Sequence, residues 1–172
     1  MHTSLAFPVK CFFMAATCGI FAGAAQSQEV LYGDFIYAEN IDDFDDTNTS
    51  FIYTESSNQD RNAMLAWRCF SDGLNIVYFF DKYLAGDDDE DVVVRYRIDR
   101  QEPSDRLYWQ LLVVQKSAYM RMNMVDSFTE LAIAGSEVRL EVTDPLDGER
   151  MVDNFSLKGL QDGLNDLHCY EK

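Results

Sequence analysis

Apolar and polar residues alternate along most of this chain, which is the pattern of short β-strands with one buried and one exposed face. The clearest example is residues 92–99 (VVVRYRID), where every second side chain is apolar and Arg95, Arg97 and Asp99 share the opposite face. Runs of the same kind, separated by turns rich in Asp, Gly, Pro and Ser, predict further strands at residues 30–37, 51–54, 63–70, 74–80, 107–115, 118–122, 137–143 and 151–157.

Two segments have the spacing of helices. Residues 127–134 (SFTELAIA) would form one or two turns, with Asp126 or Ser127 as the N-terminal cap and Gly135 at the end. Residues 159–168 place three leucines on one helical face.

Many short strands with few helices predict a mainly β fold. We expect an antiparallel β-sandwich or open barrel with a C-terminal α-helix, built as one domain over residues 26–172. The apolar fraction of 47% is sufficient for a packed core in a chain of 172 residues.

The first 25 residues have the order of a secretory signal peptide. Lys10 supplies a positive charge, residues 11–23 are apolar or small, and small residues lead to a polar stretch from Gln26. The apolar run is shorter than the roughly 20 residues that a membrane-spanning helix needs. We therefore expect cleavage near residue 25, a periplasmic or secreted protein of a Gram-negative bacterium, and no stable membrane insertion afterwards. The alternative is an ordinary buried N-terminal helix.

Export would leave two of the four cysteines, because Cys11 and Cys18 lie in the predicted leader. Cys69 and Cys169 remain, and an even pair in an oxidising compartment predicts one disulfide. This bridge would hold the C-terminal helix against the strand that carries Cys69. Lipidation of Cys18 is a weaker alternative, because residues 15–17 (AAT) differ from the usual Leu-Ala-Gly.

The chain is strongly acidic, with 30 Asp and Glu against 14 Lys and Arg and a formal net charge of −16. Such a surface repels nucleic acid and anionic lipid, so we expect no nucleic-acid partner. The acidic runs at residues 42–46 and 87–91 offer oxygen ligands that suit Ca²⁺, but neither has the spacing of a helix–loop–helix calcium site. We assign no metal site and no cofactor, and keep a calcium-stabilised carbohydrate- or surface-binding module as an alternative.

The residues predict no catalytic machinery. His168 is the one histidine after the leader, and it lies beside a cysteine that we expect to be in a disulfide. No free thiol, nucleophile motif or phosphate-binding loop follows from the remaining sequence. We therefore predict a protein that is not an enzyme. A hydrolase built on paired carboxylates is the alternative.

Arginines on otherwise apolar strands are the best candidates for binding. Arg68, Arg97, Asp99 and Trp109 would combine guanidinium, carboxylate and indole groups in one recognition patch. The competing interpretation is an internal ion pair covered by an aromatic ring.

The order of these residues resembles the VasI-like family of type VI secretion accessory proteins. The matching pieces are residues 65–69 (LAWRC), 96–99 (YRID), Trp109, 155–160 (FSLKGL) and 164–169 (LNDLHC). The resemblance implies a small exported β-rich domain of the bacterial envelope, without known catalytic machinery. We therefore expect a non-enzymatic accessory or interaction module, whose partner is an envelope or secretion-apparatus protein.

Overall fold

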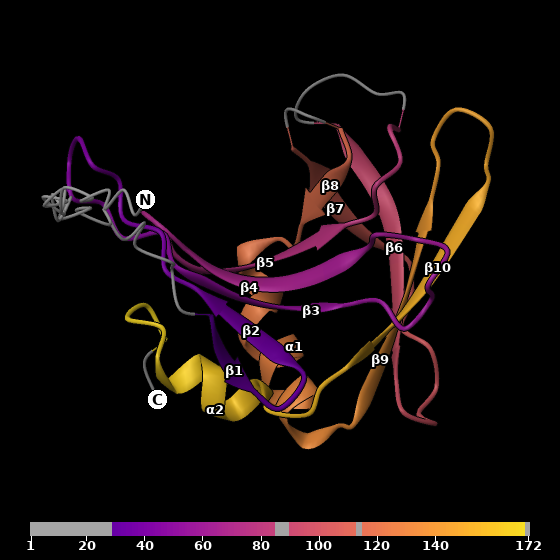
Figure 1. The fold of residues 1–172 in the computed structure, drawn as a ribbon. Coiled ribbons are helices and arrows are strands. Elements are labelled where there is room, and N and C mark those ends of the chain that lie inside the picture. The colour runs from indigo at the N-terminus through magenta and orange to yellow at the C-terminus, as the bar shows by residue number, and fades with distance from the viewer. Residues whose placement is uncertain (1–28, 85–89, 113–114, 171–172) are drawn as a thin grey trace, which may run out of the picture.

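Ten strands in the described part of the chain form one antiparallel sheet (Figure 1). The computed structural model describes residues 29–84, 90–112 and 115–170. The predicted signal peptide lies outside these residues, and so does most of the acidic run 87–91. In sheet order the strands are β1 (Val30–Tyr32), β2 (Phe35–Ala38), β3 (Phe51–Glu55), β4 (Met64–Phe70), β5 (Gly73–Phe79), β8 (Ser117–Tyr119), β7 (Leu107–Leu111), β6 (Asp91–Ile98), β9 (Glu137–Thr143) and β10 (Arg150–Ser156). The mainly β, antiparallel fold predicted from the alternation is confirmed.

The sheet curls until its last strand reaches the end of β3 (Figure 1). The backbone N–H of Ser57 donates to the carbonyl of Asn154 at 2.9 Å, and an isolated antiparallel bridge joins Ser56 to Phe155. Because one continuous sheet makes both layers, the molecule is nearer to the open barrel than to the sandwich of the two predicted forms.

The single strand predicted at residues 30–37 is in fact a hairpin, β1 and β2. Gly33 turns the chain with φ of +59°, a conformation that most side chains avoid. A Cβ atom at Gly33 would lie 2.6 Å from the carbonyl oxygen of Lys158, and one at Gly159 would lie 1.9 Å from that of Tyr32. The two glycines therefore let this hairpin touch the chain just before the C-terminal helix.

Two helices lie on the inner face of the sheet. Helix α1 (Met122–Ala134) begins earlier than predicted, with Arg121 as its cap, because the residues before Asp126 continue the helix and bury Val125. Gly135 ends it as expected. The C-terminal helix α2 (Leu160–Asn165) is confirmed but shorter than predicted. Neither helix of the described chain has the length and apolarity needed to cross a membrane.

The core forms between α1 and both halves of the curled sheet. Trp67 on β4 is fully buried, stacks on Phe128 of α1 at 6.1 Å, and donates its indole N–H to the Thr129 hydroxyl at 3.0 Å. Tyr96 on β6 meets the same Phe128 edge-on at 4.9 Å. Phe128 thus joins the β4 and β6 halves, and such aromatic packing is among the larger contributions to a core.

A buried carboxylate joins the two halves at the other end. Asp153 of β10 is 0% exposed and accepts hydrogen bonds from the Arg61 guanidinium at 2.9 Å and the Tyr78 hydroxyl at 2.5 Å. Burial and this hydrogen bond raise the pKa of Tyr78 well above its ordinary value. Buried charges are tolerated when paired and hydrogen-bonded in this way.

The predicted disulfide between Cys69 and Cys169 is confirmed, with a Cα–Cα distance of 5.7 Å. Cys69 is fully buried on the inner face of β4, and Cys169 follows α2. The bridge therefore holds the C-terminal segment against the middle of the sheet, across 100 residues of sequence.

We expect the double variant C69A/C169A to unfold at a much lower temperature than the wild type. Closing a loop of this length restricts the unfolded chain and contributes about 4–5 kcal/mol in the chain-entropy account. Thermal unfolding followed by circular dichroism measures the loss. Reductant should lower the wild-type curve to that of the variant and leave the variant unchanged; equal stability of the oxidised wild type and the variant would contradict the expectation.

The contact between β1 and α2 should weaken at alkaline pH. The Tyr32 hydroxyl donates to the Asp166 carboxylate, which raises the pKa of Tyr32 to about 12. Because the folded protein holds this proton more tightly than the unfolded chain, the stabilisation is complete below pH of about 10 and is lost as pH rises toward 12. The gap in melting temperature between wild type and Y32F should therefore close over this range. A gap that stays constant would show that the hydrogen bond is not its source.

Candidate functional site

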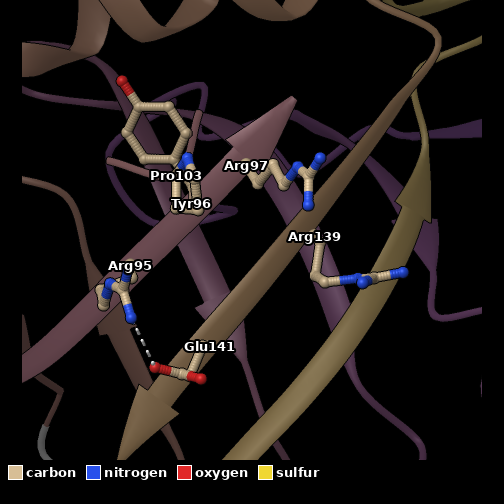
Figure 2. Close-up of a pocket in the computed structure, with 6 residues that line it drawn as sticks. All are labelled: Arg95, Tyr96, Arg97, Pro103, Arg139 and Glu141. Atoms are coloured by element: carbon tan, nitrogen blue, oxygen red, sulfur yellow. Dashed lines mark ion pairs between the residues drawn. The ribbon is translucent and has the colours of Figure 1, made fainter. Parts of the chain in front are cut away.

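Five arginines gather on the outer side of β6, β9 and β10, four of them on these strands and Arg106 just before β7, and we call this set the arginine face. It consists of Arg95, Arg97, Arg106, Arg139 and Arg150. Two adjoining hollows of about 200 and 310 Å³ lie between these side chains. The first hollow is also lined by Tyr96, Pro103 and Glu141, as Figure 2 shows.

Strand alternation and pairing build this face. In β9, Val138, Leu140 and Val142 are fully buried, so the residues between them point outward. The pairing of β6 with β9 sets Arg95 opposite Glu141 and Arg97 opposite Arg139. Residues more than forty positions apart in the sequence therefore come together.

A single carboxylate, Glu141, lines both hollows beside the five arginines. Its two oxygens lie 3.6 Å from Nη1 of Arg95 and 3.7 Å from Nη1 of Arg150. Glu137 continues the same face of β9 beyond Arg139. The chain as a whole has a net charge of −16, so this cluster of arginines has a local charge of the opposite sign.

Arg97 and Arg139 are partners across β6 and β9 (Figure 2), and neither makes an ion pair with a carboxylate among the described residues. Arg139 donates from Nε to the Asn154 side-chain oxygen at 2.6 Å. Arg97 donates from Nη2 to the Arg100 carbonyl at 3.3 Å, while its buried Nε has no partner among the described residues. Like charges in this position destabilise a sheet, and an unpaired buried donor costs more. Both costs would fall if an anion lay between the two guanidinium groups.

The structure does not bring the four predicted patch residues together. Trp109 is fully buried on the inner face, opposite Val92, so it cannot reach an external ligand. Arg68 lies on β4 in the other half of the sheet. Arg97 is therefore the one member of the predicted patch that belongs to the arginine face.

Asp99 has a structural role. Its φ of +50° departs from the strand conformation, so the alternation that would place it beside Arg97 stops there. Its carboxylate accepts backbone N–H bonds from Ser136 at 3.1 Å and Glu137 at 3.0 Å. In the described residues it makes no ion pair with Arg97, so the covered ion pair of the competing interpretation does not form either.

Four residues at the arginine face were not predicted from the sequence, namely Arg106, Arg139, Arg150 and Glu141. The alternation at residues 137–143 already put Arg139 and Glu141 on the polar side of a strand. What it could not show is that β9 lies between β6 and β10.

The acidic segment 42–46 uses its carboxylates locally. Asp42 accepts backbone N–H bonds from Phe44 at 2.7 Å and Asp45 at 3.3 Å, and Asp45 accepts one from Thr47 at 3.0 Å. Over the residues that the structure describes, no group of three or more His, Cys, Asp or Glu side chains could hold a metal ion.

Comparison with known proteins gives a likeness of fold. A scan against known protein families finds no match to this chain, and a search of curated proteins finds none either. Among solved structures, invasion associated protein B from Bartonella henselae is similar, with a TM-score of 0.54 and 14% sequence identity. The likeness covers 81% of this chain and 93% of that one. At this identity it shows a shared mainly β fold.

We expect Arg97→Met to leave the free energy of unfolding unchanged or to raise it by about 0.5 kcal/mol, because it removes a like-charge pair and an unpaired donor while keeping the apolar stem. Urea unfolding at low salt measures the difference, and added salt should reduce it. The matched control is Arg61→Met, which should lose about 3 kcal/mol because it leaves the buried Asp153 carboxylate unpaired. A loss of more than about 1 kcal/mol for Arg97→Met would assign that side chain a structural role.

Proposed function

We propose that this protein is an exported, non-enzymatic interaction module that binds a carboxylate-bearing segment of another envelope protein through the arginine face. The observation that carries the proposal is the grouping of five arginines around one carboxylate on a strongly acidic chain. Arginine is the side chain best suited to carboxylate recognition, because its planar guanidinium can donate two parallel hydrogen bonds.

Glu141 illustrates how the arginine face receives a carboxylate. It lies between Arg95 and Arg150, in contact with both guanidinium groups, and so neutralises part of the charge at that end. Arg97 and Arg139 lie one step further along the same two strands, and neither forms an ion pair with any acid in the part of the chain that the structure describes. A carboxylate from a partner would fit between these two residues as Glu141 does between its neighbours.

A short acidic segment of a protein suits this face better than a nucleic acid. The positive charge of the arginine face is limited to parts of β6, β9 and β10 and to Arg106 before β7, while the chain as a whole has a net charge of −16. A long polyanion would extend beyond the arginines onto repelling surface. A few carboxylates would remain within the arginine face.

The proposal also includes export of the protein and a role as an accessory of a larger assembly. The order of residues 1–25 and the Cys69–Cys169 bridge both favour an oxidising compartment. The resemblance to VasI-like proteins favours an accessory of a type VI secretion system in the periplasm of a Gram-negative bacterium. The partner is then an envelope or secretion-apparatus protein with an exposed acidic segment.

The test uses protein recovered from the periplasm of a Gram-negative host that expresses the full chain, so mass spectrometry also reports whether the leader has been removed. A fluorescein-labelled hexaglutamate peptide serves as the probe, and fluorescence anisotropy gives its dissociation constant. We expect R97Q/R139Q to weaken binding by about tenfold or more, since each charge-assisted bond contributes on the order of 1.5–3 kcal/mol.

The matched control is K116Q/K158Q, which removes the same charge from exposed lysines outside the arginine face. It should bind the peptide as the wild type does. Equal weakening in both double variants would mean that net charge alone is responsible, and absence of binding by the wild type at low salt would also refute the proposal.

A further inference from the structure

The outer face of β2 to β5 has a hollow of about 530 Å³ that no element of the described chain covers. Its floor is Ala66 on β4, which pairs with Tyr53 on one side and Val77 on the other. Because Ala66 is small and its neighbours are large, a depression forms at this point. The volume is in the range of small-molecule pockets, which is about 300–1,000 Å³.

The hollow is almost entirely apolar. Its walls are aromatic and aliphatic side chains that are only partly buried, namely Phe51, Tyr53, Met64, Val77 and Phe79. The helices cannot cover them, since α1 packs on Trp67 and α2 lies against Ile52, both on the inner face. Apolar surface of this kind, left open on a chain with 26% charged residues, is typical of a binding site.

Arg68 stands at one end of this hollow and is the one charged side chain among the described residues that line it. Its guanidinium carbon lies 5.6 Å from the Phe51 ring centre and 5.1 Å from that of Phe70, which holds it in place. It makes no ion pair with any residue that the structure describes, and its buried Nε has no hydrogen-bond partner there. Its Nη2 donates a long hydrogen bond, of 3.4 Å, to the Thr49 hydroxyl.

We propose that this hollow binds a free medium-chain fatty acid, with its carboxylate on Arg68 and its alkyl chain over Ala66 toward Met64. The hollow has a positive charge at one end, from Arg68, and mainly apolar side chains along the rest of its length. Arg68 and Met64 are four residues apart on one strand, so the apolar path is about 13 Å long. An extended alkyl chain of medium length fits this path. An apolar ligand without a charge would leave the Arg68 donor unpaired, and a cation would be repelled.

A second copy of this chain suits the surface less well. A two-fold dimer would place the same residues on both sides of the contact, and the lining contains no carboxylate. The Arg68 donor would then be more deeply buried and still unpaired, which is costly. A ligand that carries its own carboxylate would pair this donor.

Isothermal titration calorimetry with decanoate tests the proposal. We expect saturable binding by the wild type, and binding at least about tenfold weaker by Arg68→Met, which keeps the stem and removes the charge. Ala66→Leu should also abolish binding, because its larger side chain fills the floor while leaving Arg68 in place. Melting curves confirm that both variants fold.

Two controls distinguish a fatty-acid site from nonspecific apolar binding and from the arginine face. Decyltrimethylammonium has the same tail with a positive head, so equal affinity for it would reduce the interaction to nonspecific apolar binding and overturn the proposal. The R97Q/R139Q variant should bind decanoate as the wild type does, so the arginine face can fail its test without affecting this one. Sedimentation showing a wild-type dimer that Ala66→Leu disrupts, with no decanoate binding, would assign the surface to a second copy.

Discussion

Burial of one face of the sheet is the constraint on which the rest of the structure depends. A curled sheet of ten strands has an interior that must be filled, and α1 fills it by packing Phe128 between Trp67 and Tyr96. Because the interior is filled mostly by apolar side chains, the arginine face and the hollow around Ala66 both lie on the outer face. The alternation of each strand then decides which residues are available there.

Two interactions hold the curled sheet together, one a covalent disulfide and the other a group of buried hydrogen bonds. The disulfide fixes the C-terminal segment to β4 and acts largely by restricting the unfolded chain. The Asp153 carboxylate joins β10 to Arg61 and Tyr78 by hydrogen bonds in the interior, where an unpaired charge would be expensive. The disulfide stabilises the folded state wherever the compartment is oxidising. The hydrogen bonds of Asp153 specify how the two halves of the sheet meet.

The outer face presents two unlike surfaces. The arginine face lies on β6, β9 and β10 with Arg106 beside them, while the hollow around Ala66 lies mainly on β2 through β5, and Arg68 is the one charged residue among the described residues that line it. Each contains an arginine whose Nε lacks a partner in the described structure, namely Arg97 and Arg68. Unpaired buried donors are uncommon in folded proteins, so their presence on both surfaces is what favours recognition of anions. The two surfaces lie on different halves of the sheet.

The alternation of residues predicted most of the strands, and the even cysteine count after the predicted leader predicted the bridge, because both are local or pairwise properties. The Gly33 turn was missed since the flanking residues on both sides have the pattern of a strand. The candidate patch could not be predicted from alternation alone. Arg97 and Asp99 share a face only while the strand continues, and the positive φ at Asp99 ends the strand conformation there. Only the strand order brought Arg139 and Glu141 beside β6 and buried Trp109. Strand order is set by the packing of the whole interior, which no short stretch of sequence contains.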